Sequence, residues 1–326
     1  MSTRISRING QRPVLRGALR APARNAGLLL GAAMGLALVA AIKLRRRRAT
    51  YHWTPPSGVV THGALTARSL GSTGPPIVLL HGMVGSNISW GGEFDELAQR
   101  SRLVAIDLLG FGDSPKPAFG YSARDHADAV AACLDELAID EPAVVVGHSM
   151  GTLVALALAR YHPELVATIV AISPPVYDSR KEGARHIRAM GLPMRLMALG
   201  EASRVICHWQ CEHRELARRL APFMAPGVPK PIARAVIDHT WASYSQSLEE
   251  LILSGEAPGW LLATTRPVHL VAALDDPVPD LPLLSRLCAA NQLLSLDLWP
   301  GGGHLLPQTQ PVKCVAAIRD AAARKR

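Results

Sequence analysis

Ser149 lies at the centre of Gly147-His148-Ser149-Met150-Gly151, between an apolar run at 143–146 and a helical pattern at 152–161. The pattern G-x-S-x-G in this position is typical of a nucleophile elbow, a tight turn that holds a serine in strained backbone geometry. The two outer glycines leave room for the strand and the helix that cross there. The dipole of the following helix favours negative charge that develops beside the serine. The pattern therefore predicts that Ser149 is a nucleophile.

Two further motifs precede this pentapeptide, HGMVGS at 81–86 and DLLGFGDS at 107–114. Taken together with GHSMG, in this order, they make the chain resemble the α/β-hydrolase superfamily, in its capped esterase and lipase-like branch. The resemblance covers the chain from about Val59 to the C-terminus. It implies a triad in the order serine, acid, histidine. It also implies that the loop at 107–114 is structural.

The resemblance further implies an oxyanion hole made of two backbone N–H groups. One belongs to Met83, after the His-Gly pair, and the other to Met150, after the nucleophile. In a well-studied protease such a donor stabilises the tetrahedral intermediate by about 3 kcal/mol. His81 is expected to shape its loop rather than to act as a base, and His148 is expected to point away from Ser149.

The base of the triad should be a histidine after the last strand, and His304 follows three glycines in LLSLDLWPGGGHLLP. Among the twelve histidines, it alone lies in a glycine-rich loop at this place. The acid should follow the apolar strand at 268–273, where Asp275 and Asp276 are adjacent. Alignment with the family pattern favours Asp276, and Asp275 stays the alternative. The carboxylate would fix the imidazole tautomer and stabilise the imidazolium.

The elements that must position these residues are continuous β-branched or aliphatic runs separated by helical patterns. Such runs are typical of strands buried on both faces of a parallel sheet. The runs lie at 76–80, 103–106, 143–146, 166–172 and 268–273, the helical patterns at 122–137 and 152–161, and an early hairpin pattern at 59–70. We therefore predict an α/β fold with a doubly wound, mostly parallel sheet. The strand pattern stops between about 174 and 265, which predicts an inserted helical cap within a domain at 53–326.

The net charge of +9 is concentrated in residues 1–52, which contain ten Arg, one Lys and no acidic residue. The rest of the chain has 24 Lys and Arg against 26 Asp and Glu, so it lacks the basic footprint of a nucleic-acid-binding protein. With 48% hydrophobic and 19% charged residues, the chain can bury a core and is not disordered in composition. We predict a separate basic segment at 1–52 and no nucleic-acid partner.

Residues 26–42 form an uncharged apolar run with arginines on both sides. Its length is at the lower limit for a membrane-spanning helix. We expect an uncleaved single-pass membrane anchor, with the catalytic domain on the cytoplasmic side because the block Arg45–Arg48 would bind anionic headgroups. A cleaved targeting peptide and a helix of a soluble domain are the alternatives.

Cys207, Cys211 and His213 lie close together in the sequence and are candidate metal ligands. Their spacing also fits one face of a helix, and no second ligand pair of the kind found in zinc sites occurs elsewhere. The odd number of five cysteines favours a reducing compartment. We predict neither a metal ion nor an organic cofactor.

The expected reaction is hydrolysis of a carboxylic ester through an acyl-enzyme. An aromatic, apolar cap and a membrane anchor favour a small lipophilic ester as substrate. Acyl transfer, thioester cleavage and carbon–carbon bond hydrolysis use the same residues and stay open. A serine at the elbow, in place of an aspartate, argues against dehalogenase and epoxide hydrolase chemistry. The alternative from another class is a catalytically silent, membrane-associated binding protein, for which a broken triad is expected.

Overall fold

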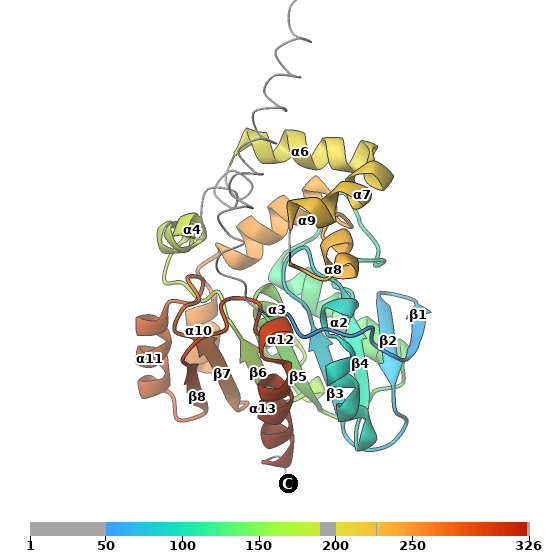
Figure 1. Cartoon of the computed structure of the whole chain (residues 1–326). Helices are drawn as coiled ribbons and strands as arrows, with labels where there is room; N and C mark the ends of the chain where they lie inside the picture. Colours follow the sequence, from blue (N-terminus) through green and yellow to red (C-terminus); the bar gives the residue numbers. More distant parts are fainter. Residues whose placement is uncertain (1–49, 190–199, 226, 325–326) are drawn as a thin grey trace, which may run out of the picture. The chain divides into compact units, whose positions relative to one another are not determined.

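The structure, a computed structural model, describes residues 50–189, 200–225 and 227–324. Its described part contains an eight-stranded sheet in the order β1-β2-β4-β3-β5-β6-β7-β8 (Figure 1). The strands are β1 (Val59–His62), β2 (Thr66–Leu70), β3 (Pro76–Leu80), β4 (Arg102–Ile106), β5 (Ala143–His148), β6 (Val166–Ile172), β7 (Val268–Ala273) and β8 (Leu294–Trp299). β2 pairs antiparallel with β1 and β4, and the other neighbours are parallel. The predicted doubly wound, mostly parallel sheet is confirmed, including the early hairpin.

The register of the sheet brings the predicted site loops to one edge. Leu80, the last residue of β3, pairs with Gly147 of β5, so the loop after β3 begins beside the elbow. Ala273, the last residue of β7, pairs with Trp299 of β8, so the loops after these two strands also start side by side. Because parallel strands end at the same edge, all four loops meet there.

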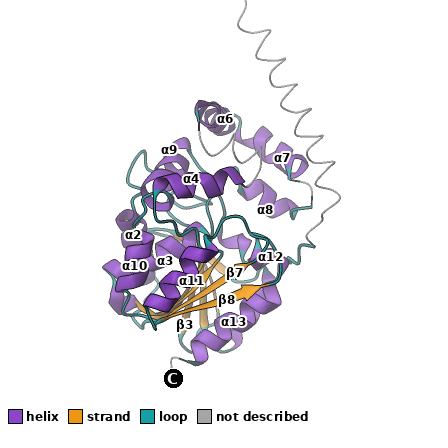
Figure 2. Cartoon of the chain, turned by 90° about the vertical axis from the view of Figure 1, so that its left-hand side faces the viewer, coloured by secondary structure: helices purple, strands orange, loops and turns teal. Residues whose placement is uncertain are grey.

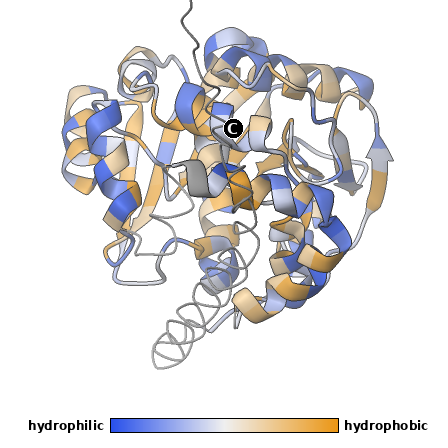
Figure 3. Ribbon diagram, turned by 90° about the horizontal axis from the view of Figure 1, so that it is seen from above, coloured by the Kyte–Doolittle hydropathy of each residue, from blue (hydrophilic) through white to orange (hydrophobic). Residues whose placement is uncertain are grey.

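Helices cover both faces of the sheet. One face packs against α2 (Ala123–Glu136), α3 (Met150–Tyr161), α10 (Ala257–Ala263) and α11 (Leu281–Ala290), and the other against η2 (Gly92–Gln99) and α13 (Pro311–Ala323). Figure 2 shows α11 and α13 on opposite sides of the strands. Alternate residues of β3 enter the two cores, with Val78 in the first and Ile77 in the second. The surrounding helices carry both hydrophilic and hydrophobic stretches (Figure 3), as helices that bury one face do.

The chain between β6 and β7 is helical in its described residues, as the sequence predicts for 174–265. Its elements besides α10 are α4 (Arg180–Ala189), α6 (Glu201–Glu212), α7 (Arg214–Met224), α8 (Lys230–Ala235), α9 (Trp241–Gln246) and the π-helix η4 (Ser247–Ile252). α10 lies within the predicted range but contacts α3 and α11, so it belongs to the layer on the sheet. η4 contacts α2 and α3, and Phe111 forms a β-bridge with His239, so the insertion is tied to the sheet layer and to the 107–114 loop.

The predicted membrane localisation needs correction. Within the described ranges, the structure has no helix that combines the length and the apolar character needed to cross a membrane. The predicted anchor at 26–42 lies outside the described residues.

Candidate active site

The turn between β5 and α3 holds Ser149 in a conformation that few L-residues adopt. Its φ is 51° and its ψ is −120°, and its N–H donates to the carbonyl of Ile172 at 2.9 Å. A Cβ atom at Gly147 would overlap the backbone of Gly151, and one at Gly151 would overlap the carbonyl oxygen of Leu80. Both outer glycines are thus required by close backbone approach, which is the geometry expected of a nucleophile elbow.

A continuous chain of hydrogen bonds joins Ser149, His304 and Asp276. The Nε2 of His304 lies 3.0 Å from the Oγ of Ser149, and its Nδ1 lies 3.0 Å from the Oδ2 of Asp276. The other carboxylate oxygen of Asp276 accepts the N–H of Val278 at 3.0 Å. The structure thus brings together the three residues predicted for the triad. Their catalytic roles stay predictions.

Asp275, the alternative acid, faces a different partner. Its carboxylate accepts the N–H of Gly303 at 2.9 Å and that of Gly302 at 3.4 Å. It is exposed, whereas Asp276 is buried. Asp275 therefore holds the glycine loop that leads to His304, and Asp276 contacts the imidazole itself.

The carboxyl of Asp276 is ionised because of its partners. Burial alone would raise its pKa, but the hydrogen bond and charge of His304 and the N–H of Val278 outweigh burial and lower the pKa below its usual value. A buried carboxylate bonded to Nδ1 leaves Nε2 of the neutral imidazole as an acceptor toward Ser149. The arrangement can therefore take a proton from the hydroxyl.

The two backbone groups predicted for the oxyanion hole flank the elbow. Met150 is the first residue of α3, and Met83 follows Gly82, where a Cβ atom would stand 3.1 Å from the Cβ of Ser149. Within the described residues, neither N–H donates to a protein acceptor. Val84, the next residue, has a φ of 54°, so this loop is strained as the elbow is. Both donors are available to a ligand oxygen.

Buried hydrogen bonds hold the loop of Met83 against the 107–114 loop. His81 donates from Nδ1 to the carbonyl of Gly82 at 2.7 Å and accepts the N–H of Leu108 at Nε2, at 2.9 Å. The carboxylate of Asp107 accepts both the backbone N–H and the side-chain amide of Asn87, at 2.5 and 2.8 Å. His81 therefore shapes its loop, as expected. Asn87 also holds this loop, but no motif in the sequence indicated its contact with Asp107.

His148 makes a contact that sequence reasoning missed. Its Nε2–H donates to the backbone carbonyl of His304 at 2.8 Å, and the two rings lie 5.2 Å apart. Burial, followed by the charge of His304, lowers the pKa of His148 to about 3, so the ring is neutral. No spacing rule predicts this bond, because its partner is a backbone atom 156 residues away. It fixes the position of the loop that carries the imidazole of His304.

Buried neutral histidines predict a loss of stability in weak acid. Burial is the largest cause that lowers the pKa of each, to about 4 for His126 and His239, to about 3 for His148, and in the same direction for His81. Below pH 6.5 the unfolded chain binds protons at these sites that the folded protein does not. The free energy of unfolding should thus fall as the pH falls from about 6.5 to about 4.5, by about 1.4 kcal/mol per pH unit for each histidine.

Urea denaturation at several pH values measures this slope. For His126→Gln, the free energy of unfolding should depend on pH with a smaller slope than in the wild-type protein. The difference should be about 1.4 kcal/mol per pH unit, the contribution of one histidine. A stability that is constant between pH 6.5 and 5 would contradict the buried, neutral state of these rings.

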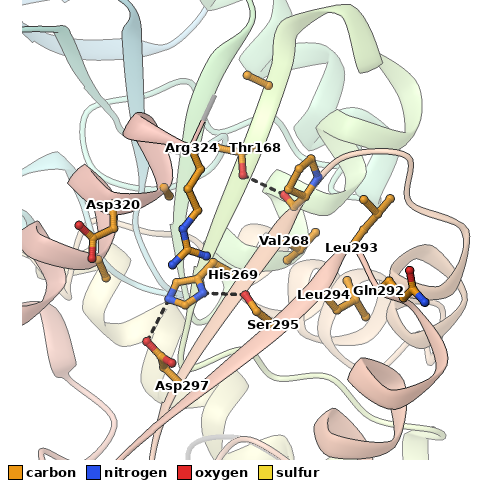
Figure 4. Close-up of a pocket in the computed structure, with 14 residues that line it drawn as sticks. Thr168, Val268, His269, Gln292, Leu293, Leu294, Ser295, Asp297, Asp320 and Arg324 are labelled. Atoms are coloured by element: carbon orange, nitrogen blue, oxygen red, sulfur yellow. Dashed lines mark hydrogen bonds and ion pairs between the residues drawn. The ribbon is translucent and has the colours of Figure 1, made fainter. Parts of the chain in front are cut away.

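A pocket of about 350 Å³ lies at the opposite ends of the strands (Figure 4). In it His269 bonds to Ser295 through Nδ1, at 2.8 Å, and faces Asp297 through Nε2, at 3.2 Å. The order of contacts resembles a triad, but the ring nitrogens are reversed relative to His304, and Asp297 is exposed. Ser295 lies inside β8 rather than at a helix N-terminus. The pocket therefore lacks an elbow of the kind that holds Ser149.

Cys207 and His213, two of the residues considered as metal ligands, contact different partners in the structure. Cys207 contacts Nε2 of His239 at 3.5 Å, whereas the ring of His213 stacks on Trp209. All five cysteines are free thiols. The histidine that contacts Cys207 is therefore His239, which is 32 residues away in the sequence.

Comparison with known proteins gives a family match and partial matches to individual relatives. The model of the alpha/beta hydrolase family matches residues 77–317. The probable lysophospholipase BODYGUARD 4 of Arabidopsis thaliana is 35% identical over 154 residues, which are 43% of this chain and 36% of that protein. The 2-(acetamidomethylene)succinate hydrolase of Mesorhizobium japonicum is 36% identical over 108 residues, 33% of this chain and 38% of that one. The match thus spans less than two fifths of either relative.

A solved structure extends the likeness over most of the chain. The crystal structure of E-2-(acetamidomethylene)succinate hydrolase superposes with a TM-score of 0.65, covering 82% of this chain and 100% of that chain at 22% sequence identity. At this identity the likeness concerns the fold alone.

Proposed function

Because the chain belongs to the α/β-hydrolase family, we propose that it is a serine hydrolase that cleaves a carboxylic ester through an acyl-enzyme on Ser149. His304 acts as the general base and acid, and Asp276 orients its ring. The observation that carries the proposal is the unbroken hydrogen-bond chain from Asp276 through His304 to a serine at the N-terminus of α3.

The reaction then proceeds in two halves. Oγ of Ser149 attacks the acyl carbonyl while its proton moves to Nε2 of His304, and the backbone N–H groups of Met83 and Met150 stabilise the oxyanion. The imidazolium gives this proton to the departing alkoxide, which leaves as the alcohol. Water, deprotonated by the same nitrogen, attacks the acyl-enzyme, and the carboxylic acid and free Ser149 result.

We also propose that the acyl group of the substrate is lipophilic and that the helical insertion covers the active site. Two observations support these points. The relative BODYGUARD 4 bears the name of a probable lysophospholipase. Met83 and Val84, beside the elbow, are half-buried apolar residues, and the 107–114 loop next to them contacts the insertion through Phe111 and His239. The insertion at 174–265 would then form a cap that limits the length of the acyl chain.

A panel of p-nitrophenyl esters from acetate to palmitate tests the substrate class. Burial of each additional methylene contributes about 0.8 kcal/mol, so kcat/KM should rise by up to about fourfold per CH2 until the pocket is filled. A decline from acetate onward would contradict the lipophilic acyl group, and turnover of none of the esters would contradict ester hydrolysis. Added alcohol acceptors, with the new ester measured by mass spectrometry, distinguish acyl transfer from hydrolysis.

A further inference from the structure

Three side chains outside the active site bring potential metal-ligand atoms within 4.8 Å of one another: Glu182, His186 and Asp280. Glu182 and His186 are four residues apart on α4, so they share one face of that helix. Asp280 is the N-cap of α11. Figures 1 and 2 show α4 and α11 on the same side of the molecule.

His186 directs one ring nitrogen toward the carboxylate of Asp280. Its Nδ1–H donates to the carbonyl of Pro277 at 2.9 Å, which selects the tautomer whose Nε2 can act as a metal ligand. That nitrogen is buried, has no hydrogen-bond partner among the described residues, and faces the Oδ2 of Asp280 at 3.7 Å. A lone pair opposite a carboxylate is unfavourable unless a cation or proton lies between them. Metal-ligating histidines commonly donate their second N–H to such a carbonyl, which fixes the tautomer.

Each of the two carboxylates has an oxygen that could bind a metal ion. Oδ1 of Asp280 accepts the N–H of Leu283 at 3.1 Å as the helix cap, which leaves Oδ2 directed at His186. Glu182 contacts Arg185 at 2.6 Å, and the side chain of Arg185 is 68% exposed. An ion pair of this kind is weak, because water solvates an exposed guanidinium well. A cation could therefore replace Arg185 as the partner of Glu182.

We infer that Glu182, His186 and Asp280 bind one divalent metal ion through one imidazole nitrogen and two carboxylate oxygens. Three such ligands, with water in a fourth position, match the coordination that Zn²⁺ takes in proteins. Ca²⁺ requires six to eight oxygen ligands and fits this donor set less well.

The ion would join α4 to the loop that carries Asp276. The ring of Tyr177 stacks on His186 at 5.2 Å, and its hydroxyl donates to the carbonyl of Val278 at 3.0 Å. The N–H of Val278 in turn bonds to Asp276. The ion would thereby stabilise the position of this carboxylate; this consequence rests on the proposed function, whereas metal binding does not.

Calorimetric titration of the full chain with Zn²⁺, after removal of metals by EDTA, tests the inference. We expect one site whose affinity falls at least about tenfold in His186→Gln and in Glu182→Gln. Glu182 is partly exposed and glutamine keeps its size, so this variant should fold normally. The control is His62→Gln, because His62 is exposed and its Nδ1 contacts the hydroxyl of Thr66 rather than a carboxylate. This variant should bind Zn²⁺ as the wild-type protein does.

Thermal unfolding with and without Zn²⁺ separates the outcomes. Zn²⁺ should raise the Tm of the wild-type chain and of Ser149→Ala, but not that of Glu182→Gln. If Ser149→Ala still binds Zn²⁺, metal binding does not depend on the proposed reaction. Unchanged Zn²⁺ affinity in both His186→Gln and Glu182→Gln would overturn the inference. Binding would then arise elsewhere, for example at the free thiols, and a proton would occupy the space between His186 and Asp280.

Discussion

Replacing Ser149 with alanine should reduce the turnover of a p-nitrophenyl ester by about 10⁶-fold, the loss that follows removal of the serine from a bacterial protease. In the proposed mechanism Oγ of Ser149 forms the acyl-enzyme, and this atom stands 3.0 Å from Nε2 of His304. Alanine removes this atom without adding bulk to the strained turn. The measurement is kcat/KM of the purified variant under conditions where the wild-type protein is active.

The matched control for this variant is Ser295→Ala. Ser295 also bonds to a histidine that faces an aspartate, but it lies in β8 beside the pocket at the opposite ends of the strands. Its loss should leave turnover unchanged. Near wild-type turnover in a folded Ser149→Ala protein, or a large loss in Ser295→Ala alone, would contradict the assignment of the nucleophile.

The second large effect is expected for Asp276→Asn, which should lower kcat by about 10⁴-fold, as loss of the orienting carboxylate does in serine proteases. The amide oxygen can accept the Nδ1–H of His304, but the neutral amide cannot stabilise the imidazolium as the carboxylate does. An asparagine NH2 directed at Nδ1 would favour the wrong tautomer. Steady-state kinetics over a range of pH values measure this loss.

Asp275→Asn is the adjacent control. An asparagine oxygen can still accept the N–H of Gly303, so the glycine loop keeps its hydrogen bond and kcat should change by less than about tenfold. If the two variants gave the reverse result, Asp275 would be the acid, and the loop after β7 would have to rearrange during the reaction.

The sequence predicted the features that depend on local pattern. Runs such as 166–172 are apolar on both faces because the sheet is covered on both sides, and β6 and β7 begin and end where the runs do. The turn that holds Ser149 could be predicted because an elbow requires glycines at fixed positions. The glycines before His304 marked its loop in the same way. The apolar runs and the glycine positions are local features, so they can be recognised in a single sequence.

Contacts between residues that are far apart in the sequence could not be predicted in this way. The bond of His148 to the carbonyl of His304 and that of Asn87 to Asp107 depend on the register of β3, β4 and β5 in the folded sheet. The same holds for Asp280, which comes beside α4 only when the loop after β7 is in place. The choice between Asp275 and Asp276 also depended on the fold, because adjacent residues in a loop differ in direction and burial rather than in pattern.

Covalent labelling with a fluorophosphonate tests most directly whether Ser149 is an activated nucleophile. An activated serine displaces fluoride and keeps the phosphonyl group, so the mass of the full chain should rise by one such group. Peptide mass spectrometry should place that group on Ser149, and Ser149→Ala should remain unlabelled. Labelling at another residue, or equal labelling of the wild-type and Ser149→Ala proteins, would contradict the proposed acyl-enzyme mechanism.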